Sequence, residues 1–288
     1  MAKIADAFDP RARLPRARTV ACGDGWSVNQ VVCALGPHDR PFEERHSSVS
    51  IAIVMAGTFQ YRSHAGRDLM TPGSLLLGSA GQCFECGHEH GTGDRCISFQ
   101  YSPEFFDRIE AGPVFRAQRV PPARTLSPLI ARASAALAGA DPISWEELSI
   151  ETAARAVQLD RGLSMDPSSA GSGATARVAR VVRRIECDPG GACGVSALAR
   201  EARLSPYHFL RTFQSVTGVT PHQYLLRLRL QRAAARLRSE STKVVDIAFD
   251  CGFGDVSNFN RTFRAEFGVS PRVWRRPVLH YSRGSEGV

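Results

Sequence analysis

Cysteine and histidine side chains gather in one segment, from residue 83 to residue 96. Cys83 and Cys86 have the two-residue separation of a metal-binding knuckle, and His88, His90 or Cys96 can complete a set of four ligands. Thiolate sulfur and imidazole nitrogen are the ligands that zinc and other thiophilic metals prefer. The spacing therefore predicts a zinc-type site, or a thiol pair that responds to redox state.

The same segment also fits a purely structural interpretation. A free cysteine is a common buried small apolar residue, so Cys83 and Cys96 can face the core. His88 and His90 can be solvated or hydrogen-bonded loop residues. Three glycines between Cys86 and Cys96 favour a hairpin that would bring Cys96 back beside Cys86. Metal binding, redox sensing and packing all remain open on the sequence.

A second feature is a sequence block that occurs twice in the C-terminal half. Phe-Leu-Arg-Thr-Phe at 209–213 and Gly-Val-Thr-Pro at 218–221 recur 50 positions later, as Phe-Asn-Arg-Thr-Phe and Gly-Val-Ser-Pro. Seven positions are identical at this single offset. Two copies are too few for a solenoid, which buries its core between three or more units. They indicate two equivalent modules.

Each copy has the pattern of two short helices joined by a tight turn. Ser205 in the first copy and Asp255 in the second can cap the helix that follows the turn. Gly218 and Gly268 can end that helix in a left-handed conformation. A short helix, a turn and a capped helix are typical of a helix-turn-helix, whose second helix can enter the DNA major groove.

The outer faces of the two capped helices carry side chains that can contact DNA bases. Arginine can hold guanine, and asparagine can hold adenine, by two hydrogen bonds. The alternative is a pair of solvated amphipathic helices in an ordinary helical protein. The outward positions are Tyr207, His208, Leu210, Arg211 and Gln214 in the first copy and Val256, Ser257, Asn258, Asn260, Arg261 and Arg264 in the second.

The distribution of charge favours nucleic acid as the partner of the C-terminal half. Residues 171–288 contain 19 Lys and Arg against 9 Asp and Glu, a net charge of +10. Residues 1–170 contain 17 against 19, a net charge of −2, and the two values give the total of +8. A basic half that also contains the repeats is expected of a phosphate-binding domain.

Between the two copies, Thr220 and Pro221 begin a long helix that we expect to reach about Arg238. It would be a stiff spacer between the modules, with apolar residues on its inner side and arginines over much of the rest. The predicted inner residues are Leu225, Leu228, Ala233, Ala234 and Leu237, and the arginines are Arg227, Arg229, Arg232, Arg236 and Arg238.

The segment Asp246-Ile247-Ala248, followed by Cys251-Gly252-Phe253 and by residues 259–271, closely resembles the signature of the AraC/XylS family of transcriptional regulators. The resemblance covers residues of about 177–277 and implies two helix-turn-helix units that insert into successive major grooves. Leu210 and Val256 cannot hydrogen-bond to bases, so they would touch a thymine methyl group or fill space. The base-contacting residues that the resemblance implies are Tyr207, Leu210, Arg211, Val256, Ser257, Asn258, Asn260 and Arg261.

The N-terminal half has short β-prone runs separated by glycine and proline, and helical patterns after them. Residues 72–77 resemble the turn and strand of cupin-like jelly rolls, and the arrangement resembles the effector and dimerisation domain common in the AraC family. A barrel mouth would be the default pocket. The predicted strands are Trp26–Leu35, Val49–Met55, Thr58–Arg62, Gly73–Leu77 and Arg95–Tyr101; the predicted helices are Pro103–Ile109, Ser127–Leu137 and Trp145–Leu159.

We therefore expect an α+β multidomain chain. Its N-terminal part would be a cupin-like β-barrel with trailing helices, and its C-terminal part an all-α domain with two helix-turn-helix motifs. The predicted divisions are a mobile arm (1–18), the effector domain (19–163), a Gly/Ser-rich linker (164–176), the DNA-binding domain (177–277) and a tail (278–288).

A cupin-like domain raises a second possibility for a metal. Ordinary cupin metal sites favour histidine and carboxylate ligands, which His38, Glu44 and His46 can supply, although their spacing departs from the usual motif. Cys22 and Cys33 lie on other predicted strands and can approach the cysteine cluster.

The predicted function is sequence-specific transcriptional regulation, not catalysis, with a small-molecule, metal or redox signal received by the N-terminal half. The expected partners are double-stranded DNA, the effector, a second copy in a homodimer and, for an activator, RNA polymerase. Residues 1–18 lack the apolar core of a secretory signal, no run spans a membrane, and eight cysteines without such a signal predict reduced thiols in the cytoplasm. The alternative is a DNA-repair or cupin metalloenzyme fused to the same DNA-binding domain. A repair protein of that kind uses a four-cysteine zinc site, and its second cysteine pair is not evident in the sequence.

Overall fold

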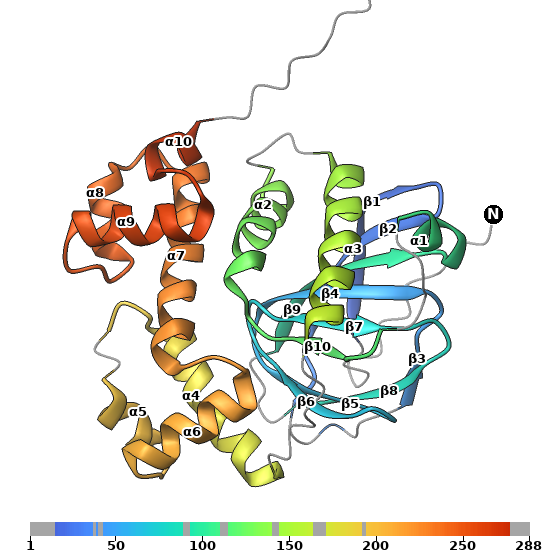
Figure 1. Cartoon of the computed structure of the whole chain (residues 1–288), viewed down its shortest axis with the longest axis horizontal. Helices are drawn as coiled ribbons and strands as arrows, with labels where there is room; N and C mark the ends of the chain where they lie inside the picture. Colours follow the sequence, from blue (N-terminus) through green and yellow to red (C-terminus); the bar gives the residue numbers. More distant parts are fainter. Residues whose placement is uncertain are drawn as a thin grey trace, which may run out of the picture.

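A β-sandwich with helices against it forms one side of the molecule, and a cluster of helices forms the other (Figure 1). The long helix α7 (Pro221–Ser239) runs through the helical cluster beside α2 (Ser127–Leu137) of the sandwich half. These features come from a computed structural model, which describes residues 15–36, 39, 43–88, 93–109, 115–139, 144–163, 171–191 and 194–276.

The N-terminal half contains two antiparallel sheets. Its strands are β1 (Arg16–Gly23), β2 (Trp26–Cys33), β3 (Glu43–Arg45), β4 (Val49–Ala56), β5 (Phe59–Ser63), β6 (Gly66–Met70), β7 (Leu75–Gly78), β8 (Cys83–Gly87), β9 (Asp94–Tyr101) and β10 (Arg119–Val120). One sheet has the order β1-β2-β9-β4-β7-β10, and the other has the order β3-β8-β5-β6.

The six-stranded sheet is buried on both faces, which explains the nearly continuous apolar run of β4. Ile51 and Ile53 point to the helices α1 (Pro103–Ile109), α2 and α3 (Trp145–Gly162), while Ala52 and Val54 point to the second sheet. Successive side chains of a strand alternate between faces, so one strand can serve two cores. The inner face between the sheets is therefore a separate compartment from the core under the helices.

The predicted cupin-like barrel is not closed. Among the described strands, no backbone ladder joins the two sheets, so β1 and β10 remain edges of one sheet and β3 and β6 edges of the other. A closed barrel requires the ladder to continue around the whole circumference. The sequence pattern predicted five of the ten described strands and contained no information about closure.

The five predicted strands are present, with ends shifted by no more than two residues. The sequence missed β1, β3, β6, β8 and β10, which are short, charged or at an edge and so lack an apolar alternation. β1 begins at Arg16, inside the segment that we expected to be an arm. β8 carries Cys83 and Cys86, which we expected on or beside one hairpin loop.

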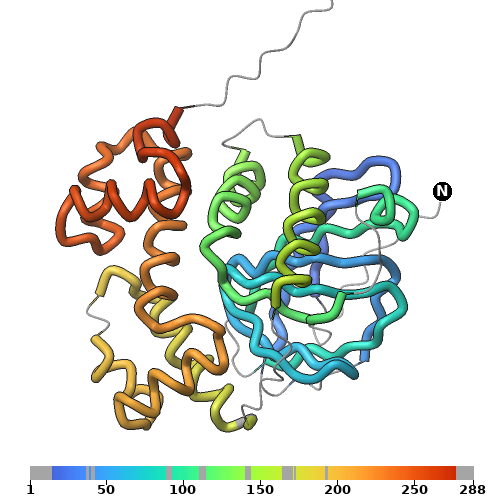
Figure 2. Tube along the Cα trace, viewed as in Figure 1, coloured from blue at the N-terminus to red at the C-terminus, as the bar shows by residue number. Residues whose placement is uncertain are grey.

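The C-terminal half consists of helices in the predicted order. They are α4 (Ser172–Cys187), α5 (Val195–Glu201), α6 (Pro206–Thr217), α7, α8 (Val244–Asp250), α9 (Val256–Phe267) and α10 (Pro271–Arg275). Because α4 begins at Ser172, residues 172–176 of the predicted linker are helical. Figure 2 follows the chain from the lower module, with α5 and α6, along α7 to the upper module, with α8 and α9.

The predicted helix caps are confirmed in both modules. Ser205 accepts a hydrogen bond from the backbone N–H of His208, and Asp255 accepts one from that of Asn258. Gly218 and Gly268 end their helices with φ of 80° and 78°, the left-handed region that favours glycine. Local sequence therefore fixes both ends of each second helix.

Each module has its own apolar core. Phe209 and Phe213 of α6 pack with residues of α4 and α7, and Phe259 and Phe263 of α9 pack with residues of α7 and α10. All four rings are fully buried. Since α7 contributes to both cores, it sets the position of one module relative to the other, as predicted.

The arginines of α7 differ from the prediction that they cover its solvent side. Arg229 donates hydrogen bonds to the carbonyl oxygens of Pro189 and Gly252, at 2.6 and 2.8 Å. Arg227 donates to the carbonyl oxygen of Pro122, at 2.8 Å. These guanidinium groups hold the surrounding elements together, so the basic residues of α7 are structural.

Candidate DNA interface and thiol site

The first recognition helix, α6, presents its predicted reading residues to solvent. Tyr207 is 63% exposed and Leu210 is 39% exposed. Arg211 Nη1 lies 3.2 Å from the hydroxyl oxygen of Tyr207, and the guanidinium carbon lies 5.8 Å from the centre of the ring. Tyr207 therefore holds the arginine in one orientation on the exposed face.

The second recognition helix, α9, has an equivalent arrangement with different chemistry. Arg261 Nη2 donates a hydrogen bond to the side-chain oxygen of Asn258, at 3.1 Å. Ser257, Asn260 and Arg261 are exposed, whereas Val256 and Asn258 are half-buried. An arginine that is oriented before DNA arrives loses less side-chain freedom when it binds a base.

The cysteine knuckle predicted from the sequence is wrong in geometry. Cys83 and Cys86 are three residues apart on strand β8, so their side chains point to opposite faces. Cys83 is exposed, whereas Cys86 packs against the apolar residues between the sheets. Cys96 is buried on β9 of the opposite sheet, and His90 lies outside the described residues. The predicted ligand set is therefore not assembled in the described part of the chain.

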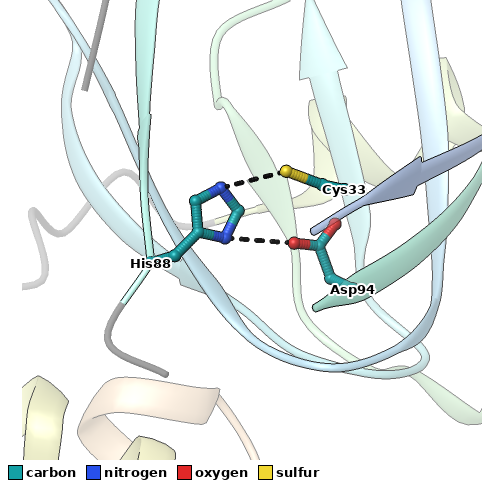
Figure 3. Close-up of side chains that lie close together, drawn as sticks. All are labelled: Cys33, His88 and Asp94. Carbon is teal, nitrogen blue, oxygen red and sulfur yellow. Dashed lines mark hydrogen bonds and ion pairs between the residues drawn. The ribbon is translucent and has the colours of Figure 1, made fainter. Parts of the chain in front are cut away.

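His88 of the predicted set instead meets Cys33 and Asp94. Cys33 ends β2 and Asp94 begins β9, and the two are paired residues in the antiparallel ladder of these strands. His88 follows β8 of the other sheet and faces them across the sandwich. His88 Nε2 lies 3.4 Å from the sulfur of Cys33, and Nδ1 lies 3.1 Å from a carboxylate oxygen of Asp94 (Figure 3).

These three residues form a chain, thiol to imidazole to carboxylate, around one imidazole ring. Their potential ligand atoms all lie within 4.8 Å of one another. However, the thiol and the carboxylate use different ring nitrogens, and a single ion would bind only one of these nitrogens. The geometry therefore fits proton transfer and charge pairing better than convergence on an ion.

The side chains of His88 and Asp94 are nearly inaccessible, at 4% and 5% exposure. Burial lowers the pKa of an imidazole, but the contacts to Asp94 and Cys33 outweigh it and raise the pKa of His88 to about 9. His88 Nδ1 and Asp94 Oδ2 are close enough for an ion pair, although neither has a partner in hydrogen-bond geometry. The imidazolium is thus stabilised mainly by charge.

Burial shifts the pKa values of other titratable groups between the sheets toward the neutral forms. Burial lowers the pKa of His46 to about 4 and raises the pKa of Glu44. His46 Nε2 lies 2.8 Å from the hydroxyl of Tyr61, and its ring stacks on Phe84. Burial raises the pKa of the Cys86 thiol. His46 is therefore a packed ring, and His38, its partner in the cupin-type prediction, lies outside the described residues.

Two cavities lie where the sandwich meets the helical half. One, of about 470 Å³, is lined by Cys33 and Asp94 on the sandwich side and by Arg183, Glu186 and Cys187 of α4 on the other. A second cavity, of about 360 Å³, lies between α2, α7 and the sandwich. Glu186 borders both, and its carboxylate accepts a hydrogen bond from the backbone N–H of Gly57 at 3.0 Å.

The sequence missed Asp94 and Glu186 as site residues. Asp94 became a partner of Cys33 through the register of β2 and β9, which local sequence does not encode. The sequence indicates that Cys33 can approach the cysteine cluster, but it groups His88 with Cys83 and Cys86 instead of with Cys33 and Asp94. No sequence pattern marks Glu186, because its role arises from contact between the two halves of the molecule.

The C-terminal residues are similar to known proteins. A family model described as "Helix-turn-helix domain" matches residues 198–277. The transcriptional activator RhaS of Escherichia coli O139:H28 is 46% identical over 80 residues, 28% of this chain and 29% of RhaS. The regulator Rv1931c of Mycobacterium tuberculosis is 38% identical over 87 residues, 30% of this chain and 34% of that protein. The match thus spans about a third of each relative.

One solved structure similar to this chain is a transcriptional regulator from Chromobacterium violaceum, described among AraC-type DNA-binding domain-containing proteins. Its sequence is 28% identical to that of this chain. It matches 36% of this chain and 94% of its own, with a TM-score of 0.34. The family model covers both modules, beginning within α5 of the first. Residues 198–277 of this chain match a helix-turn-helix domain that relatives named as transcriptional regulators resemble.

Proposed function

We propose that the chain is a sequence-specific DNA-binding transcriptional regulator. The observation that carries this proposal is the pair of exposed arginines, Arg211 and Arg261, at equivalent positions of two capped helices. Each is oriented by a neighbour on its own helix, at Tyr207 or Asn258. Two such helices supported by one rigid helix can enter successive major grooves of DNA.

The sandwich half would receive the signal, a small molecule, a metal ion or a change in redox state. Its support is position: it contacts both modules and borders both interdomain cavities. A ligand in either cavity would alter contacts to α4 or α7, and so the placement of the modules. A homodimer is proposed on the resemblance of the N-terminal half alone. Contact with RNA polymerase would follow if the chain activates transcription, as RhaS does by its name.

The alternative of a repair enzyme finds no support in the cysteine geometry. Such a site needs four thiolates at one zinc ion. In the described part of the chain, Cys83 and Cys86 diverge across the two faces of β8.

Among the described helices, none combines the length and the apolar character that a membrane span requires.

The proposal is tested by selecting bound sequences from a random double-stranded DNA library with the full chain. We expect one enriched motif, with affinity that falls steeply as salt rises because phosphate binding releases counterions. The Arg211→Ala/Arg261→Ala double variant should lose the motif, while Arg62→Ala, an exposed arginine on the sandwich, should retain it. Absence of any motif, or the same motif in the double variant, would refute the proposal.

A further inference from the structure

Cys33 differs from the other cysteines of the sandwich in having both an acid–base partner and a cavity. Its sulfur contacts His88, and Asp94 contacts the far nitrogen of that ring. It also lines the 470 Å³ cavity at the junction with α4. Cys83 is exposed, and burial raises the pKa of the Cys96 thiol well above its ordinary value. Cys33 is itself buried, with 6% of its surface exposed, and the cavity borders it.

A thiol beside a protonated imidazole is activated as a nucleophile, because the positive ring stabilises the thiolate. An ordered base–nucleophile pair, with a third group that orients the base, is the arrangement used by cysteine nucleophiles in general. Here Asp94 orients and stabilises the protonated ring, and the contact of His88 with the sulfur places this positive charge beside Cys33. Geometry alone thus distinguishes Cys33 from a packed cysteine.

We propose that Cys33 is a sensor nucleophile that captures small conjugated carbonyl compounds in the cavity against α4. This rests on the proposed function, because it names the signal that the regulator would receive. Arg95 and Arg183 line the same cavity, and their guanidinium groups can donate hydrogen bonds to a carbonyl oxygen. A conjugated carbonyl compound thus matches both the nucleophile and the donors.

The reaction is an addition that needs no oxidant and has no leaving group. The Cys33 sulfur bonds to the β-carbon, and the electrons of the carbon–carbon double bond move onto the α-carbon and the carbonyl oxygen. The thiol proton has already left to solvent, because His88 is protonated, and the resulting enolate takes a proton from the His88 imidazolium. The ring regains a proton from solvent, so a thioether and an imidazolium remain, and atoms and charge balance.

The cavity also connects Cys33 to the DNA-binding half. A Cβ on Gly57 would lie 2.4 Å from the carbonyl oxygen of Gly93, next to Asp94, so Gly57 packs directly on this strand. The backbone N–H of Gly57 donates to Glu186 of α4, and α4 packs on α6 in the first module. An adduct on Cys33 would occupy the space in front of α4 and disturb the Gly57–Glu186 contact.

The test uses the full chain, N-ethylmaleimide as an uncharged conjugated carbonyl probe, and peptide mass spectrometry to measure the rate at each cysteine. An ordinary thiol should slow by roughly 50-fold or more between pH 8 and pH 6, because its thiolate fraction falls. Cys33 should slow by less than about tenfold, and at pH 6 it should react faster than Cys187. Cys187 lines the same cavity and is exposed, whereas Cys33 is buried, so a faster reaction at Cys33 cannot come from easier access.

His88→Gln should remove this excess rate at pH 6, and Asp94→Asn should reduce it, whereas Cys83→Ser should change nothing. Modification should alter the affinity of the wild-type chain for its selected DNA motif, and Cys33→Ser should be insensitive to the probe. Cys33 reacting no faster than Cys187, or reacting without any change in DNA affinity, overturns the inference. If no motif can be selected, the proposed function fails while the rates at Cys33 still test its activation.

Discussion

The two helix-turn-helix modules share one internal design but are attached to the sandwich in different ways. At equivalent positions near the ends of their recognition helices, α6 has Val216, buried in its module core, and α9 has Glu266. Glu266 lies 3.5 Å from Arg227 and 3.9 Å from Arg124, and it accepts a hydrogen bond from the hydroxyl of Ser127. The second module thus docks on the sandwich half through a charged cluster.

The first module docks through shape and the backbone. Gly218, which ends α6, leaves room for Pro121, since a Cβ there would lie 2.6 Å from the proline ring. Arg119 donates to the carbonyl oxygen of Thr217 at 3.2 Å. The repeated residues therefore encode folding and DNA reading, while unrepeated neighbours encode how each module is held. A signal in the sandwich can act on the modules unequally.

The largest expected effects come from the shared cores. Phe213→Ala and Phe263→Ala should each destabilise its module by about 3–5 kcal/mol, because a fully buried ring leaves a cavity. Denaturant unfolding with hydrogen exchange should locate the loss in the first and the second module respectively. Tyr207→Ala, on the exposed face of α6, is the control and should leave stability unchanged. Equal loss in both modules from either variant would show that they do not fold as separate cores.

Substitutions on the reading faces should affect binding without affecting stability. Arg211→Ala and Arg261→Ala should each weaken binding to the selected motif by about 1–3 kcal/mol, the value of a bidentate base contact. Affinity for random DNA should change much less. Competition binding with motif and random duplexes measures the ratio. An unchanged ratio in one variant would mean that its module contacts only phosphates.

The docking difference predicts a smaller effect that is confined to one module. Glu266→Gln retains an acceptor for Ser127 but removes the charge opposite Arg227, at a cost on the order of 1 kcal/mol. Hydrogen exchange should increase where α9 meets α2 and stay constant at the α6–Pro121 contact. Glu240→Gln, in an exposed ion pair with Arg236, is the matched control. Increased exchange at both contacts would show that the two docking surfaces open together.

An effect that depends on pH distinguishes the sandwich from both modules. The pKa of His88 rises from 6.5 to about 9 on folding, through its contacts with Cys33 and Asp94. The stabilisation is therefore complete below about pH 6.5 and is lost as pH rises through about 9. Urea unfolding should show a wild-type advantage over His88→Gln at pH 6 that shrinks by pH 10. A constant difference across this range would mean that the ring is neutral throughout.

The sequence predicted the C-terminal half more completely than the N-terminal half, and the reason is physical. Caps, phenylalanine pairs and terminal glycines act over a few residues, so Ser205, Asp255 and Gly218 could be placed correctly. The thiol site depends on register and on the approach of two sheets. The spacing of Cys83 and Cys86 fits a knuckle, but the pleat of β8 turns their side chains to opposite faces.

The way in which each module docks on the sandwich half was not predictable from the sequence either. Glu266 occupies the position of a buried valine in the other copy, and nothing in the local pattern indicates contact with Ser127 of the other half. The arginines of α7 likewise looked like a solvated face. Their carbonyl partners, such as Pro122 and Gly252, become neighbours only after the chain has folded.

Guanine methylation interference on the selected motif shows whether each module reads its own major groove. We expect two groups of sensitive guanines, separated by one helical turn of about 10–10.5 base pairs. Arg211→Ala should abolish interference in one group and Arg261→Ala in the other. A single group of guanines, or the loss of both groups in either variant, would mean that the two modules do not read separate grooves.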